Sequence, residues 1–274
     1  MPSTAVGDLN VAYDIHGSGE PLLMINGIGA ERAGWALQVP AISRVLMTIT
    51  YDNRDVGETG PGRDPKPYAI RQFADDTAGL LDALGIESAH IVGASMGGCI
   101  AQEFAISHPD RARSATIICS WPRVDPWLAE LWEQWEHLFR ALGPVEWGRT
   151  SWLWVFTHRA YREPGFLDGL LSAAAANPRK QTLEMYLRQS HAAKTFDAID
   201  RLGGVTAPTH VICGEEDIFT PRRYSEAISA AIPNAKLSVM PAVGHGMFWE
   251  ATDAFNELVL DFLREQKRRA AGEA

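Results

Sequence analysis

Short apolar runs recur in the first and last parts of the chain and predict the strands of one sheet. Residues 10–15 alternate apolar and polar positions, as an antiparallel strand with one solvated face does, and the turn Gly17-Ser18-Gly19 follows. Six further runs are rich in apolar residues and indicate more buried strands. They span residues 21–25, 45–51, 90–92, 115–119, 206–213 and 236–240.

Between these runs, apolar residues recur every three or four positions, the spacing that places them on one face of a helix. Residues 72–84 carry such a stripe, and Gly85 ends it. A second helical pattern begins at Ile100, directly after a strand run. A third closes the chain with apolar positions at Phe255, Leu258, Val259, Phe262 and Leu263.

Strand signals stop at Trp121 and return only after about Leu202, and the stretch between them is helical in pattern. Seven of the nine tryptophans lie in its first half: Trp121, Trp127, Trp132, Trp135, Trp147, Trp152 and Trp154. Apolar positions from Trp127 to Leu142 predict a single helix face. We therefore divide the chain into a core, residues 1–120 and 203–274, and a helical insertion, residues 121–202.

Composition fits one globular unit of enzyme size, because 274 residues with 46% hydrophobic and 22% charged side chains can build a large core. The net charge of -9 argues against nucleic acid or an anionic membrane as a partner. No leader-like or membrane-spanning apolar run is present, so we expect a cytoplasmic protein. Cys99, Cys119 and Cys213 lie in apolar segments without metal-ligand spacing, which predicts reduced, buried thiols.

The candidate chemistry centres on Gly93-Ala94-Ser95-Met96-Gly97, which stands between an apolar run and a helical pattern. A strand, a sharp turn and a helix are the context in which a Gly-x-Ser-x-Gly serine becomes a nucleophile. Gly93 and Gly97 would leave room for the tight turn because they carry no Cβ atom. Ser95 is therefore the predicted nucleophile.

This unit resembles the nucleophile elbow of the α/β-hydrolase family. The resemblance implies an α/β fold with a mostly parallel, eight-stranded sheet flanked by helices, and makes residues 121–202 the inserted helical cap. In the family, the loop after an early strand begins His-Gly and donates one oxyanion-hole N–H; here it reads Asn26-Gly27-Ile28-Gly29-Ala30. The resemblance implies oxyanion donors at the Ile28 and Met96 N–H groups.

The resemblance also implies an acid and a base, in the family order after the serine. The family pattern Gly-x-x-Asp-x-x-x-Pro matches Gly214, Asp217 and Pro221, so Asp217 is the expected acid and Asp125 the fallback. His245 lies in a glycine-flanked loop before the last helix and is the expected base. The remaining histidines are interpreted as structural: His16, His90, His108, His137, His158, His191 and His210.

A charged turn, residues 52–59, is similar to the family's Asp-x-Arg-Gly-x-Gly-x-Ser turn, with Asp55 and Thr59 replacing a glycine and the serine. Its alternating charges can pair with one another and hold the neighbouring oxyanion loop. The alternative is an Arg54 that faces substrate.

Together these residues predict hydrolysis of a carboxylic ester or lactone with a hydrophobic portion, through a Ser-His-Asp triad and an acyl-enzyme. The chain is similar to enol-lactonases and polyketide methylesterases. The expected partner is a small hydrophobic ester or lactone, with no metal or organic cofactor; a homodimer stays open. Substrate contacts are expected from Trp121, Trp127, Trp154 and Met247.

Three rival functions use the same residues. Carbon–carbon bond hydrolases of aromatic ring cleavage share Trp249-Glu250 after the histidine, but they typically carry Asn before the serine and an aromatic residue after the histidine, where this chain has Ala94 and Gly246. Cofactor-free perhydrolases and haloperoxidases use the same triad. A non-catalytic ligand receptor is the alternative of a different class. Haloalkane dehalogenation is disfavoured because Ser95 stands where an aspartate is needed.

Overall fold

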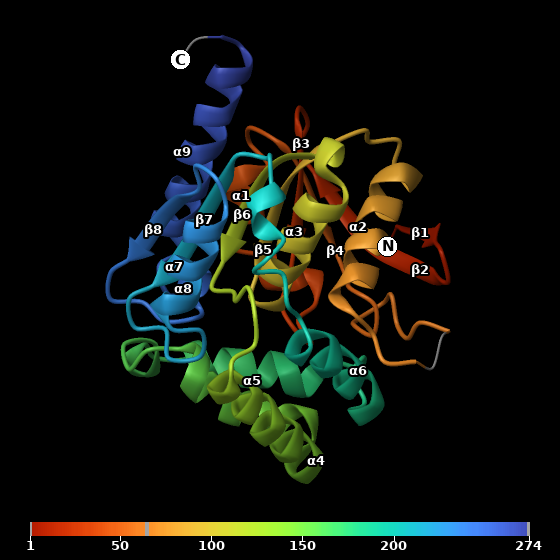
Figure 1. Cartoon of the computed structure of the whole chain (residues 1–274). Helices are drawn as coiled ribbons and strands as arrows, with labels where there is room; N and C mark the ends of the chain where they lie inside the picture. The colour runs from red at the N-terminus through yellow and green to blue at the C-terminus, as the bar shows by residue number, and fades with distance from the viewer. Residues whose placement is uncertain (1, 64–65, 273–274) are drawn as a thin grey trace.

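A computed structural model describes residues 2–63 and 66–272 and has an eight-stranded sheet at its centre, in the order β1-β2-β4-β3-β5-β6-β7-β8 (Figure 1). The strands are β1 (Ser3–Val6), β2 (Leu9–His16), β3 (Pro21–Ile25), β4 (Met47–Tyr51), β5 (Ala89–Ala94), β6 (Ala112–Ile118), β7 (Thr209–Gly214) and β8 (Lys236–Met240). β2 pairs antiparallel with β1 and β4, and all other neighbours are parallel. The predicted fold class is confirmed.

Helices cover both faces of the sheet, because alternate residues of each buried strand point to opposite sides. Leu23 of β3 belongs to the same apolar cluster as Phe104, while Leu22 belongs to the opposite cluster with Phe255. The helices are α1 (Val39–Ile42), α2 (Ile70–Ala83), α3 (Met96–Ser107), α4 (Pro126–Val155), α5 (Phe166–Ala176), α6 (Leu183–Lys194), α7 (Arg222–Ala231), α8 (Met247–Glu250) and α9 (Thr252–Ala270). They form the two outer layers, except for α4, α5 and α6.

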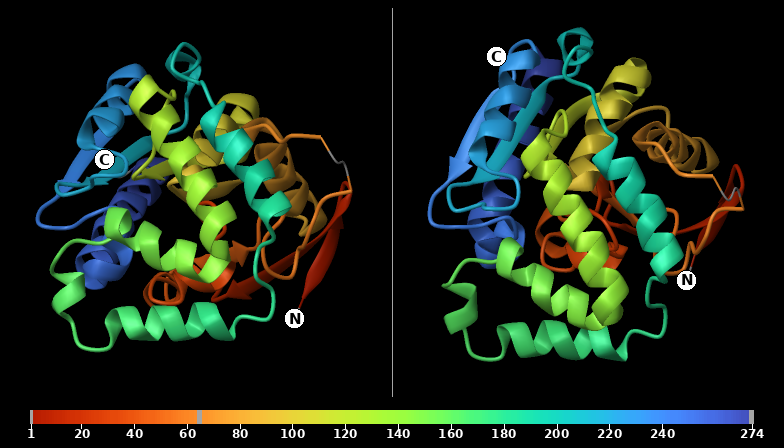
Figure 2. Two further views of the ribbon diagram at one scale, coloured as in Figure 1. Left: turned by 90° about the horizontal axis from the view of Figure 1, so that it is seen from below. Right: turned by 60° about the horizontal axis from the view of Figure 1, so that its bottom comes forward.

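Those three helices follow β6, precede β7 and gather at one end of the sheet, as Figure 1 and both views of Figure 2 show. We call them the cap. The first half of α4 lies beside α6, and the second half lies toward α5. The cap lies over the ends of the strands from which the expected catalytic loops emerge.

Two elements differ from the sequence-based expectation. The sequence analysis did not predict β1, because its four residues are too few to show a clear pattern; β1 pairs with β2. The long helix α4 is broken at Gly143, whose φ of 73° and ψ of 174° are not helical, and Pro144 follows. The predicted helical face from Trp127 to Leu142 lies entirely before this break, and the sequence analysis did not predict the helical segment that continues after it to Val155.

Candidate active site

Ser95 stands between β5 and α3 in a strained backbone conformation, with φ 57° and ψ -121°. A non-glycine residue rarely adopts such a positive φ, so the surrounding chain must impose it. A Cβ on Gly97 would overlap the carbonyl oxygen of Ile25, and one on Gly93 would overlap the carbonyl oxygen of Gly97. These close approaches require the two glycines and fix the turn against β3. Gly98 is equally constrained, because its Cβ would lie 2.6 Å from the Cβ of Ser120.

Asp217 and His245 meet in the loops after β7 and β8. The Nδ1 atom of His245 lies 2.9 Å from Oδ2 of Asp217. The Phe219 and Thr220 N–H groups donate to Oδ1 of Asp217, and the Thr220 hydroxyl donates to Oδ2 over 2.8 Å. An ionised carboxylate only accepts hydrogen bonds, so Nδ1 of His245 carries the proton and Nε2 is left with a lone pair.

His245 is buried among groups that favour its charged form. Burial itself acts to lower the pKa of His245, but the neighbouring Cys119 and the Asp217 carboxylate act to raise it. The net result is a pKa of His245 above its ordinary value. The imidazole is therefore a stronger base than a free histidine.

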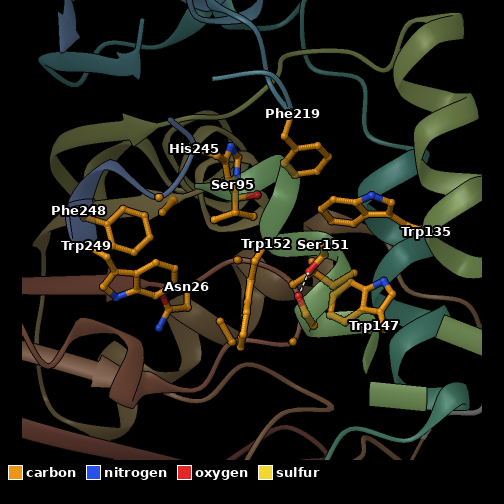
Figure 3. A pocket seen from close by; sticks show the side chains of 18 residues that line it. Asn26, Ser95, Trp135, Trp147, Ser151, Trp152, Phe219, His245, Phe248 and Trp249 are labelled. Carbon is orange, nitrogen blue, oxygen red and sulfur yellow. Dashed lines mark hydrogen bonds between the residues drawn. The ribbon is translucent and has the colours of Figure 1, made fainter. Parts of the chain in front are cut away.

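Ser95 and His245 line the same cavity, and Figure 3 shows the imidazole beside the serine. The loop after β3 borders Ser95 on another side, since a Cβ on Gly27 would lie 3.5 Å from the Ser95 Oγ. In this loop the Gly29 N–H donates to Gln189 and the Ala30 N–H to Gly27, and no hydrogen bond of the described residues uses the Ile28 N–H.

Met96 is the first residue of α3, so its N–H has no partner within the helix. The amides that flank the elbow on its two sides are thus available for an anion next to Ser95. The Ile28 and Met96 N–H groups therefore stay the predicted oxyanion donors.

The cavity above Ser95 has a volume of about 260 Å³ and a largely aromatic wall. Figure 3 shows its side chains converging from the cap and the core. The residues that line the cavity are Asn26, Gly27, Ile28, Gly29, Ala30, Ala94, Ser95, Trp135, Trp147, Gly148, Ser151, Trp152, Val155, Phe219, His245, Gly246, Phe248 and Trp249. Within the described part of the chain, no lysine, arginine, aspartate or glutamate lines this wall.

The four residues expected to contact substrate lie outside this wall, which corrects the sequence-based assignment. Trp121 is fully buried behind it, against Trp132, and Met247 is buried in the core cluster on the other face of the sheet. Trp127 is 42% exposed beneath the guanidinium of Arg223. Trp154 packs partly buried against the main core.

Other tryptophans take that place, namely Trp135, Trp147, Trp152 and Trp249. Trp135 lies before the break at Gly143 in α4, and Trp147 and Trp152 lie after it. The density of tryptophans in the sequence predicted an aromatic roof, but it did not show which indoles face the cavity.

Two further alternatives have structural roles. The Asp125 side chain accepts from the Leu128 N–H and caps α4. Arg54 forms two hydrogen bonds with Asp76, 2.6 and 2.7 Å long, and lies over the Tyr68 ring. The charges of the turn thus pair with residues outside it, while the Asn53 side chain donates to the Asn26 carbonyl oxygen in the neighbouring loop. Arg54 does not line the cavity.

The site contains a group of side chains of the types that bind metals, namely Cys119, Asp217 and His245. Their ligand-type atoms lie within 4.8 Å of one another. Both carboxylate oxygens of Asp217 already accept hydrogen bonds, and Oδ2 faces Nδ1 of His245. These contacts orient His245 for proton transfer.

Comparison with known proteins agrees with this fold. The alpha/beta hydrolase fold family matches residues 20–252, which include all three candidate catalytic residues. The chain belongs to this family. It is accordingly a hydrolase, and none of its described helices is long and apolar enough to cross a membrane.

Individual relatives cover almost the whole chain. A protein of Azorhizobium caulinodans named "Putative carbamate hydrolase RutD" is 32% identical over 97% of this chain and 99% of its own length. The enol-lactonase of Burkholderia xenovorans LB400 is 27% identical with a TM-score of 0.86, over 96% of this chain and 100% of that one. The meta-cleavage product hydrolase of Pseudomonas fluorescens IP01 is 26% identical with a TM-score of 0.82, over 97% and 98%.

Proposed function

We propose that the protein hydrolyses neutral carboxylic esters or lactones with a small hydrophobic portion, through Ser95, His245 and Asp217. The observation that supports this most directly is the position of Ser95, strained at an elbow on an apolar cavity that His245 also lines. The hydrogen bond from His245 to Asp217 supplies the base with its orientation.

The reaction follows from these positions. His245 Nε2 takes the Ser95 hydroxyl proton while Oγ bonds to the substrate carbonyl carbon, and the carbonyl oxygen becomes an anion beside the Ile28 and Met96 N–H groups. Collapse breaks the ester bond, and the alkoxide leaves with the proton from His245. Water, deprotonated by His245, then attacks the acyl-Ser95 ester and releases the carboxylic acid and free serine.

The cavity supports a restricted substrate class. Its volume of about 260 Å³ lies just below the usual range of small-molecule sites, so short acyl chains should fit best. Among the described residues, the wall offers no lysine or arginine to pair with a substrate carboxylate, so a charged acyl group would lose hydration without gaining an ion pair.

Carbamate hydrolysis is the second candidate, favoured by relatives of that name that are similar over nearly the full chain. The same attack on a carbamate carbonyl would use the same three residues. A neutral carbamate ester suits this wall better than a carbamate anion, for the reason given for charged acyl groups.

The test is hydrolysis of p-nitrophenyl esters of increasing chain length by the wild-type protein and by Ser95→Ala, with a γ-lactone, a p-nitrophenyl carbamate and a ring-cleavage dienone in parallel. We expect ester turnover that Ser95→Ala abolishes. Dienone turnover far above ester turnover would contradict the proposal and indicate carbon–carbon bond hydrolysis. Peroxide-dependent halogenation without ester turnover would indicate a perhydrolase. A folded protein whose Ser95 resists a fluorophosphonate would be a receptor.

A further inference from the structure

Gln189, in cap helix α6, reaches the loop that carries the Ile28 N–H. Its side chain is fully buried. Its Oε1 accepts from the Gly29 N–H at 2.9 Å and from Nε2 of Gln181 at 3.0 Å, and its Nε2 donates to the Arg54 carbonyl oxygen at 2.7 Å. One neutral amide thus joins the cap to two core loops.

An ion pair beside Gln189 holds the same helix in place. Arg188 forms two hydrogen bonds with the buried Asp55 carboxylate, both 2.8 Å long, and its guanidinium lies over the Tyr68 ring. Asp55 has a φ of 67°, which turns its carboxylate toward the cap from the position where the family carries a glycine. A buried ion pair tolerates little displacement, so the position of Gln189 is fixed by more than its own contacts.

We propose that Gln189 is a positioning residue that holds the oxyanion loop in its working conformation, which rests on the proposed function above. Gly29 has a φ of 66° and follows Ile28, so its peptide group is one of the two that flank the Ile28 Cα. Fixing the Gly29 N–H on Gln189 limits rotation about Ile28 and leaves the preceding N–H directed at the site of the anion. The cap therefore contributes to stabilising the transition state as well as to enclosing substrate.

The test replaces Gln189 with methionine, which keeps the length and removes the acceptor. We expect kcat for a short p-nitrophenyl ester to fall about 10- to 100-fold, since a small misplacement of a stabilising group has an effect of that order, while KM stays within about threefold. The Ki of an alkyl trifluoromethyl ketone, which forms an oxyanion on Ser95, should rise by the same factor as kcat/KM falls.

Ser190→Ala is the matched control. Ser190 is buried next to Gln189 but donates to Glu136 of α4, and Glu136 keeps its ion pair with Lys194. We expect this variant to lose thermal stability and to keep kcat and Ki within about twofold of the wild type.

A folded Gln189→Met protein with the kcat and Ki of the wild type would overturn the proposal. An equal change of kcat and Ki in Ser190→Ala would overturn it too, because that result would indicate general loosening of the cap. If Gln189→Met does not fold, Gln189→Asn decides, because its amide is one methylene too short to hold Gly29 and should show the same parallel change in kcat and Ki. An inactive wild-type protein would instead refute the proposed function.

Discussion

At the scale of single residues, Asp217 orients His245 and favours its charged form. Its carboxylate accepts three hydrogen bonds from Phe219 and Thr220, which hold it beside the imidazole. Because Cys119 and Asp217 together act to raise the pKa of His245, the base should lose its proton above the ordinary pH range of histidine. The family resemblance predicted Asp217 and His245, whereas Thr220 carries no signal in the sequence.

Replacing Asp217 with asparagine should lower kcat for a p-nitrophenyl ester by about 10⁴-fold, because the imidazole loses its orientation and correct tautomer. The acid limb of the kcat/KM profile should also move to lower pH, since a group that raises the pKa of His245 has been removed. Steady-state rates between pH 5 and 10 measure both effects. An unmoved limb would contradict the role of the carboxylate.

Trp152 is the cap indole whose removal should enlarge the cavity above Ser95. In Trp152→Ala we expect the ester chain length of maximal kcat/KM to increase by about two to four carbons, because the indole volume becomes available to the acyl chain. Trp127→Ala is the control, since Trp127 lies exposed away from this wall and should leave the profile unchanged. A chain-length profile that changes in Trp127→Ala and not in Trp152→Ala would instead support the predicted substrate contact of Trp127.

At the scale of elements, strand and helix periodicity predicted the sheet and α2 well, because those elements pack with one face or both faces on a continuous core. The observed α2, Ile70–Ala83, lies within two residues of the predicted helix. The cap was harder, because the apolar stripe before Gly143 includes both the exposed Trp127 and the cavity residue Trp135, and the helix then breaks at Gly143. Periodicity describes an unbroken helix and contains no information about the angle of a break.

The elbow is the element with the least tolerance for change. Gly97→Ala should leave little folded protein, because the new Cβ would overlap the carbonyl oxygens of Ile25 and Asn26. Gly169→Ala, in the open surface of α5, is the counterpart, and we expect it to be neutral or to raise stability by about 0.5–1 kcal/mol. Soluble yield and urea unfolding distinguish the two.

At the scale of the whole molecule, the site depends on contacts between parts of the chain that are far apart in sequence. Gly29 and Gln189 are separated by 160 residues, and Asp55 and Arg188 by 133. No local pattern marks a glutamine as the partner of a distant loop. The sequence could therefore identify the residues expected to do chemistry, but not those that hold them through the cap.

Arg188→Met should lower the free energy of unfolding by about 3–5 kcal/mol at pH 8, because it leaves the Asp55 carboxylate buried without its cation. Burial raises the pKa of Asp55 and Arg188 lowers it, so the variant raises that pKa further. A carboxyl with a raised folded-state pKa contributes stability at low pH that is lost as pH rises.

The loss in Arg188→Met should thus be smaller at pH 5 than at pH 8, as urea titrations at the two values would measure. Asp55→Asn/Arg188→Met, which removes both charges, should recover part of the loss at pH 8. Equal losses at both pH values, with no recovery in the double variant, would show that the pair does not act through charge.

The contact between Gly29 and Gln189 also bears on how the protein is made. Synthesis delivers Ser95 and its elbow early, while the cap residue that fixes the oxyanion loop arrives much later and His245 later still. A growing chain that has completed the elbow therefore still lacks His245 and the contact of Gln189. If Ser95 and His245 act as proposed, the site is complete only after β8 has been synthesised.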